Sequence, residues 1–224
     1  MTTSKCEREY DFALVLSGVT ELTTAVEDAL YEVGCSDATL SISYGRLFME
    51  FSRKSLSLKD ALLSAIRDVR RSGINADVLQ VDECNFVTQS EIARRIDRSR
   101  QQVHQYITGQ RGPGGFPPPV CHLREETPLW QWCAVSFWLC ENNMIRPEET
   151  YDAEVVFAIN TALESAQQRC RNRELVEEVT KAITACARSN DQTDGQVTKD
   201  GERNPRLIDR HAIDVADPRN ATQG

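Results

Sequence analysis

The sequence predicts an α+β protein, and three observations support this prediction. Residues 10–82 alternate strand-like and helix-like patterns twice, residues 88–109 hold two short capped helices, and residues 147–183 show further helical periodicity. Apolar residues make up 40% of the 224-residue chain and charged residues 27%, a balance typical of a globular protein. We therefore expect a βαββαβ sandwich followed by a mainly helical second half.

The first domain is expected over residues 8–83. The stretch "YDFALVLSG" is strand-like, and "ELTTAVEDALYEVG" places apolar residues on one helical face. Two alternating runs, "ATLSISYGRLFMEFS", meet at Gly45, and "SLKDALLSAIRDVRRSG" repeats the helical pattern before the strand "INADVLQVD". The order βαββαβ folds naturally as a ferredoxin-like sandwich, with two helices on one face of a four-stranded antiparallel sheet. This fold hosts many activities, so it indicates no function by itself.

The rest of the chain is expected to divide into three parts. Residues 86–146 form a second domain, residues 147–188 form C-terminal helices, and residues 189–224 form a disordered tail. The last part is polar and lacks periodicity, which is typical of disorder. The C-terminal helices are indicated by apolar residues at helical spacing: Val155, Val156, Ile159, Leu163, Leu175, Val176, Val179 and Ile183.

Two potential capping boxes lie eleven residues apart in the second domain. Thr88 with Glu91 begins one helix, and Ser99 with Gln102 begins another. Because only two residues separate the last apolar residue of the first helix from the second cap, the helices must cross steeply. That arrangement is a helix-turn-helix. The second helix is expected to turn three residues inward: Val103, Tyr106 and Ile107.

The opposite face of the second helix carries polar side chains suited to DNA. Glutamine can pair bidentately with adenine and arginine with guanine in the major groove, while nearby arginines suit phosphates. Residues 83–124 hold six arginines and three acidic residues, although the whole chain has a net charge of −8. The alternative is a solvated helix face that is merely polar. The candidate DNA-binding residues are Arg94, Arg95, Arg98, Ser99, Arg100, Gln101, His104, Gln105, Thr108 and Arg111.

The stretch "SEIARRIDRSRQQVHQYITG", with "GFPPPV" and "PLWQWCAVSFWL" after it, resembles the winged helix-turn-helix of MerR-type and excisionase-type DNA-binding domains. The resemblance covers roughly residues 87–139 and implies a recognition helix over 99–108, followed by a wing. The family's turn glycine is replaced by Asp97, and the usual apolar residue after it by Arg98. Aspartate tolerates a left-handed backbone better than most residues, so we expect the turn to survive.

No motif of the sequence indicates catalysis, a cofactor or a membrane segment. The three histidines form no catalytic order, and the loop Gly112–Gly115 lacks the lysine of a phosphate-binding loop. Cys121, His122, Cys133 and Cys140 have zinc-ligating atoms but no known zinc-site spacing, so buried reduced thiols are favoured over a metal site. The apolar runs are too short to span a bilayer and the start of the chain lacks a signal sequence, which predicts a cytoplasmic protein.

These observations together predict a sequence-specific double-stranded DNA-binding protein without enzymatic activity. We expect a bacterial transcriptional regulator that inserts the 99–108 helix into the major groove and binds a two-part site as a homodimer. The alternative is a protein-interaction module, antitoxin-like or a phage-defence adaptor, whose tryptophan-rich helix contacts another protein. Salt should weaken the first kind of complex far more than the second.

Overall fold

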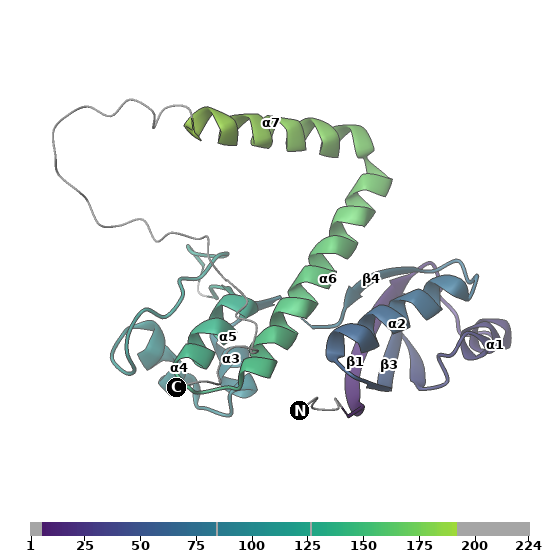
Figure 1. The fold of residues 1–224 in the computed structure, drawn as a ribbon, viewed down its shortest axis with the longest axis horizontal. Coiled ribbons are helices and arrows are strands. Elements are labelled where there is room, and N and C mark those ends of the chain that lie inside the picture. Colours follow the sequence, from purple (N-terminus) through teal and green to yellow (C-terminus); the bar gives the residue numbers. More distant parts are fainter. Residues whose placement is uncertain (1–5, 84, 126, 192–224) are drawn as a thin grey trace, which may run out of the picture. The chain divides into compact units, whose positions relative to one another are not determined.

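A computed structural model describes residues 6–83, 85–125 and 127–191, with side chains as far as residue 185. Its chain divides into two compact units, with the boundary between Val176 and Glu177. The predicted α+β class is confirmed, since an antiparallel βαββαβ sheet comes first and helices dominate the second half (Figure 1).

The first six elements form the predicted βαββαβ unit. They are β1 (Arg8–Ser17), α1 (Thr24–Glu32), β2 (Ala38–Ser43), β3 (Arg46–Ser55), α2 (Leu58–Arg71) and β4 (Asp77–Val81). The four strands lie in the order β2-β3-β1-β4, and every neighbouring pair is antiparallel. This order and connectivity are consistent with a ferredoxin-like sandwich.

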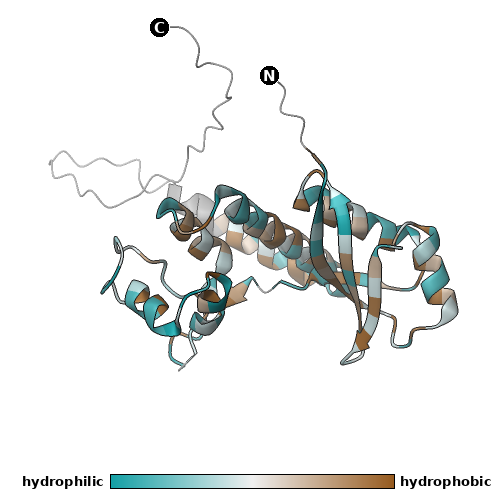
Figure 2. Ribbon diagram, turned by 90° about the horizontal axis from the view of Figure 1, so that it is seen from below, coloured by the Kyte–Doolittle hydropathy of each residue, from teal (hydrophilic) through white to brown (hydrophobic). Residues whose placement is uncertain are grey.

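The core of this unit lies between one sheet face and the helices. Leu14 of β1 pairs with Met49 of β3, and both side chains are fully buried. Leu62 of α2 covers them, and the alternation of apolar and polar residues along the strands is visible in Figure 2. Burying one such side chain stabilises the fold by about 1.5–3 kcal/mol. The apolar periodicity of β3 and α2 determines which side chains are buried in this layer.

A buried arginine ties the sheet to the helical layer. Arg53 of β3 donates to both oxygens of Asp37, at 2.7 and 3.0 Å, and to Asp68 of α2 at 2.8 Å. It also donates to the Ser64 hydroxyl and to the carbonyl of Gly34. Burial alone would lower the pKa of this guanidinium, but its hydrogen bonds to the two carboxylates outweigh burial and raise the pKa.

The second half of the chain builds a separate hydrophobic core. Its elements are β5 (Phe86–Val87), α3 (Gln89–Arg95), α4 (Arg100–Ile107), β6 (Trp130–Gln131), α5 (Trp132–Glu141), α6 (Pro147–Arg171) and α7 (Arg173–Asp191). Strands β5 and β6 pair antiparallel, and Val87, Ile92 and Leu139 lie at the centre of this core. Helix α7 continues beyond the predicted start of the tail at residue 189, and residues 192–224 lie outside the described residues.

Helix α6 covers the outer edge of the sheet. The Asn160 side chain accepts a hydrogen bond from the Val81 amide at 2.7 Å and donates to the carbonyls of Val81 and Glu83, at 3.2 and 3.3 Å. Gln167 donates to the carbonyl of Leu79 at 2.8 Å. An edge strand left open would present unpaired backbone groups to other chains, and these amides occupy part of that edge. Helix α6 therefore covers part of the edge strand β4.

Replacing Asn160 with leucine should lower the free energy of unfolding of the βαββαβ unit. The change keeps the branched shape and the number of heavy atoms of the side chain but leaves the Val81 amide and two carbonyls without their partner, which costs about 2–4 kcal/mol. Urea unfolding followed by circular dichroism measures the loss. The matched control is Gln168→Leu on the exposed side of the same helix, expected to change stability by less than about 0.5 kcal/mol. Equal midpoints for the two variants would mean that the edge contact contributes nothing.

Candidate nucleic-acid interface

Helices α3 and α4 are short, and each begins at the predicted cap. The Thr88 hydroxyl accepts from the Glu91 amide and the Ser99 hydroxyl from the Gln102 amide, both at 3.2 Å. These bonds satisfy amide donors that the helix itself cannot, so each helix start is fixed by its sequence. The buried Ala93 on α3 lets α4 approach, as expected.

The turn between the two helices depends on Asp97. Its φ is +50°, the left-handed conformation that the replaced glycine of the resembled family would adopt. After the turn, the Arg98 amide donates to the Ala93 carbonyl at 2.9 Å, and the Gln89 side chain donates to the Arg100 carbonyl at 2.8 Å. These two bonds hold the start of α4 against α3.

Helix α4 separates an apolar face from a polar one. Val103 and Tyr106 are buried, and Ile107 is half-buried against the same core. The polar face holds no acidic side chain, and one of its members, Gln105, is half-buried. The remaining predicted contacts on this helix and its cap are exposed: Ser99, Arg100, Gln101, His104 and Thr108.

The four flanking arginines differ in their surroundings. Arg98 and Arg111 are exposed near the two ends of α4, and Arg94 is exposed on α3. Arg95, by contrast, is only 16% exposed, lies 4.7 Å above the Trp132 ring and faces Glu91 at 4.0 Å. Of the ten predicted DNA-binding residues, Arg95 is therefore the least suited to phosphate and the best suited to holding α3 against the base of α5.

The glycine-proline segment after α4 is anchored by tryptophans. The Trp138 indole donates to the Gly114 carbonyl at 2.9 Å, and the Trp130 indole donates to the Pro117 carbonyl at 3.1 Å. Phe116 meets the Trp138 ring edge-on, with 4.9 Å between the ring centroids. Gly112 has a φ of +85°, and a Cβ there would come within 3.3 Å of the Tyr106 ring. The segment is thus an ordered loop whose Phe116 side chain packs on Trp138.

Beyond this loop the chain folds into a small projection. Cys121 and Leu129 form an isolated antiparallel bridge, and between them His122 contacts the Glu125 carboxylate at 2.6 Å. Leu123 is 68% exposed, and Arg124 beside it is also exposed. Arg124 adds an available cation that the sequence-based set of DNA-binding residues omitted. Its membership of the arginine-rich segment 83–124 is the sequence signal that could have found it.

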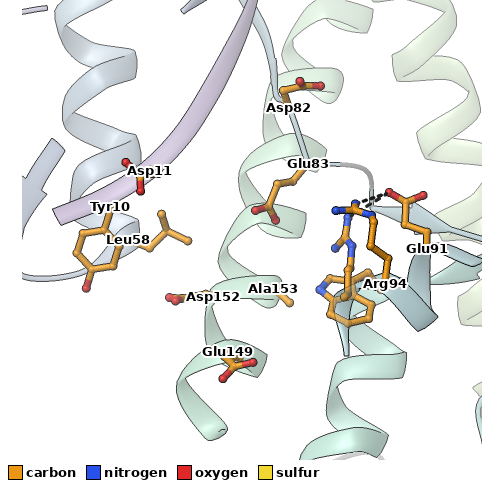
Figure 3. Close-up of a pocket in the computed structure, with 12 residues that line it drawn as sticks. Tyr10, Asp11, Leu58, Asp82, Glu83, Glu91, Arg94, Glu149, Asp152 and Ala153 are labelled. Atoms are coloured by element: carbon orange, nitrogen blue, oxygen red, sulfur yellow. Dashed lines mark hydrogen bonds and ion pairs between the residues drawn. The ribbon is translucent and has the colours of Figure 1, made fainter. Parts of the chain in front are cut away.

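A pocket of about 640 Å³ is lined in part by Glu91, Arg94 and Arg95 of α3 (Figure 3). Glu91 contacts Arg94 there at 3.4 Å, and Asp152 contacts Arg8 at 3.7 Å. Burial raises the pKa of the Asp152 carboxyl, and the nearby Arg8 charge opposes that rise. Carboxylates outnumber arginines in this lining, so its field disfavours a polyanion. Its acidic members are Asp11, Asp82, Glu83, Glu91, Glu149 and Asp152.

The described residues bring no metal-binding group together. No three histidine, cysteine or acidic side chains within residues 6–83, 85–125 and 127–191 are arranged to hold an ion, and this includes the Cys121, His122, Cys133 and Cys140 set. The cysteines described there are free thiols, and burial raises the pKa of Cys35 to about 11. No described helix combines the length and apolar character required to cross a bilayer.

Comparison with known proteins identified no relative. No protein-family model, no curated protein and no solved structure matches this chain.

The geometry of the turn generates a first test of the helix pair. Asp97→Val places a β-branched side chain at a positive φ and should destabilise the second core by about 1–3 kcal/mol, whereas Asp97→Gly should leave stability unchanged or raise it. Thermal unfolding of both variants measures the difference. A valine variant as stable as the glycine variant would show that the turn does not adopt the left-handed conformation.

Proposed function

We propose that this chain binds double-stranded DNA in a sequence-specific manner and acts as a bacterial transcriptional regulator. In this proposal, α3 and α4 form a helix-turn-helix of the winged type, and α4 enters the major groove. The observation that carries the proposal is the polar face of α4, which exposes Arg100, Gln101 and His104 without an acidic neighbour on the helix.

The chemistry of this face supports base recognition. Arg100 and Gln101 lie in the first turn of α4, the part of a recognition helix that reaches deepest into the groove. Their side chains offer the bidentate pairings that guanine and adenine accept. Because Val103 and Tyr106 are buried, the orientation of this polar face is fixed by the core behind it.

The surrounding cations support phosphate contacts. Arg98 and Arg111 flank α4, and Arg124 occupies the projection after the proline-rich loop, where a wing would approach the DNA backbone. Three such contacts give modest affinity at physiological salt, so useful binding requires two copies on a two-part site. The acidic pocket and the net charge of −8 would discourage adhesion of other surfaces to DNA.

The reading face can be tested by a double substitution. Arg100→Ala with Gln101→Ala should lower affinity for a selected site by about 30- to 20,000-fold, because each of the two bidentate pairings contributes about 1–3 kcal/mol. Sites are first selected from a random duplex pool, and binding is then measured by fluorescence anisotropy. The matched control is Arg70→Ala with Gln80→Ala, the same residue types exposed on α2 and β4. The proposal fails if both double variants bind the selected site like the parent chain.

A second candidate function is a protein-interaction module. Its support is the exposed apolar surface of the second half, where Phe137 on α5 is 50% exposed and Leu123 is more exposed still. An antitoxin-like protein or a phage-defence adaptor would use such a surface against another protein.

Salt separates the two candidates. A DNA complex with three neutralised phosphates should lose about 40-fold in affinity between 50 and 200 mM salt, since the logarithmic slope is about −0.9 for each phosphate. A protein complex centred on Phe137 and Leu123 should change by less than about threefold. An affinity for DNA that does not change over this range of salt would contradict the phosphate-driven proposal. Substitution of Arg98, Arg111 or Arg124 by alanine should each reduce the slope of log affinity against log salt concentration by about one.

A further inference from the structure

Two adjoining pockets lie beside the first turns of α6, within the compact unit that ends at Val176. The larger one, of about 640 Å³, is lined by residues of β1, α2, α3, α5 and α6 and by the residues that follow β4 (Figure 3). The smaller one, of about 430 Å³, shares Tyr10 and Asp152 with it. Sites for small molecules occupy about 300–1,000 Å³, so both volumes suit such a ligand, and their alignment along one helix suits an elongated one.

The charges of the larger pocket favour a cation. Its lining has six carboxylates and two arginines, a net charge of −4, and the smaller pocket adds one acidic and one basic residue. No ion pair among the described residues includes Asp11, Asp82 or Glu83, although the Ser52 hydroxyl donates to Asp11. A concave site with an excess of one charge attracts the opposite one. The other three carboxylates each have an arginine nearby, at 3.4, 3.7 and 2.8 Å, in the pairs Glu91 with Arg94, Asp152 with Arg8 and Glu149 with Arg146.

Tyr10 contributes a polar group that is independent of these charges. The residue is only 9% exposed, and its hydroxyl makes no hydrogen bond to any residue that the structure describes. In the same part of the chain, no fully enclosed side-chain oxygen lacks a partner, so the Tyr10 hydroxyl opens to the pockets that the residue lines. A phenol oxygen can accept a hydrogen bond from an ammonium group. The Arg8 guanidinium already lies 4.5 Å from the centre of the Tyr10 ring, so a cation is accommodated there.

The arrangement of the carboxylates favours a linear polycation over a metal ion. Figure 3 shows them spread along the pocket from Asp82 at one end to Glu149 at the other. Across residues 6–83, 85–125 and 127–191, no three acidic, histidine or cysteine side chains converge on one ion. A linear polyamine carries ammonium groups separated by a few methylene groups, so one molecule reaches several separate carboxylates. Its methylene groups can pack on apolar surface, as the stem of a lysine does. The apolar lining residues are Leu56, Leu58, Trp132, Tyr151 and Ala153.

We propose that the two pockets form one binding site for a linear aliphatic polyamine. A triamine matches the three carboxylates that face no cation, Asp11, Asp82 and Glu83, and the Tyr10 hydroxyl accepts a hydrogen bond from the ligand. Because β1 and α3 both line the site, the bound polyamine contacts the βαββαβ unit and the helix pair together. The polar face of α4 has no part in the site, so the inference does not depend on the proposed function.

Binding is tested by isothermal titration calorimetry of the full-length chain with spermidine, a triamine, at about 0.15 M salt, where exposed charges are screened. One spermidine should bind per chain with a dissociation constant below about 1 mM. Putrescine, a diamine, should bind about 2- to 5-fold more weakly, because one ion pair is lost. The absence of binding below about 1 mM, or equal affinities for the two amines, would overturn the proposal.

The carboxylates are tested by a matched pair of double substitutions. Asp82→Asn with Glu83→Gln should lower spermidine affinity about 4- to 25-fold, because each lost ion pair contributes about a factor of 2–5. Glu27→Gln with Asp28→Asn removes the same charges from the exposed surface of α1 and should change affinity by less than about twofold. Equal losses in both double variants would mean that the net charge of −8 attracts spermidine without a site, which would overturn the proposal.

The hydroxyl is tested by Tyr10→Phe, with Tyr44→Phe on fully exposed surface as its control. Tyr10→Phe should weaken spermidine binding at least about tenfold, since a hydrogen bond to a charged group contributes that much. Its urea unfolding midpoint without spermidine should equal that of the parent chain, because the lost hydroxyl has no partner among the described residues. Tyr44→Phe should change neither quantity. Spermidine affinity unchanged in Tyr10→Phe would overturn the assignment of this residue to the site.

A basic segment of another protein is the other class of cation that these charges could attract. Trilysine with both ends blocked carries the same charge as spermidine, and it should bind more weakly, since a peptide backbone fills the pockets less well. Tighter binding of trilysine would assign the surface to a protein partner and overturn the proposal. Displacement of spermidine by an equal concentration of Mg²⁺ would overturn it as well. These titrations contain no DNA, so their failure leaves the proposed function untouched, and loss of selective DNA binding in a chain that binds spermidine would contradict the proposed function alone.

Discussion

The hydrogen bonds between the Asn160 side chain and the edge strand β4 are the contact on which the organisation of the βαββαβ unit depends. Asn160 is buried and satisfies both the amide and the carbonyl of Val81. Three apolar neighbours on the same helix, Val155, Val156 and Leu163, join the core of the βαββαβ unit. Near its start, α6 also packs against α5, where the Thr150 hydroxyl donates to the Ser136 carbonyl at 3.3 Å. One helix therefore contributes to the core of the βαββαβ unit and also contacts α5.

This double role explains why residues up to Val176 form one compact unit although the sequence suggests separate domains. The edge of β4 is paired with α6 through hydrogen bonds, and α5 lies against the start of the same helix. A helix of 25 residues is long enough to supply both along its length. The arginine cluster at Arg53 acts more locally, because all of its partners belong to the βαββαβ unit.

The regular parts of the fold could be predicted from the sequence because they depend on local periodicity. The apolar run of β1, the alternation of β3, the helical stripe of α2 and the caps at Thr88 and Ser99 all concern residues close together in the chain. The Asn160 contact spans 79 positions, and an asparagine in an amphipathic helix looks like a solvated residue until the facing strand is known. The stacking of Arg95 on Trp132 could not be predicted for the same reason, since it depends on tertiary packing.

The charges around α3 and α4 are unequally distributed, and this matters because the whole chain has a net charge of −8. The pocket side of α3 gathers carboxylates, whereas α4 presents only cations and neutral polar groups. A strongly acidic chain can bind a polyanion only through such a segregated surface, because carboxylates elsewhere repel phosphates over about 8–10 Å at physiological salt. If two copies that associate weakly bind the two halves of one site, binding of one copy raises the local concentration of the other, so assembly becomes coupled to the DNA site. A regulator built this way would respond steeply to its own concentration without requiring a tight dimer in solution.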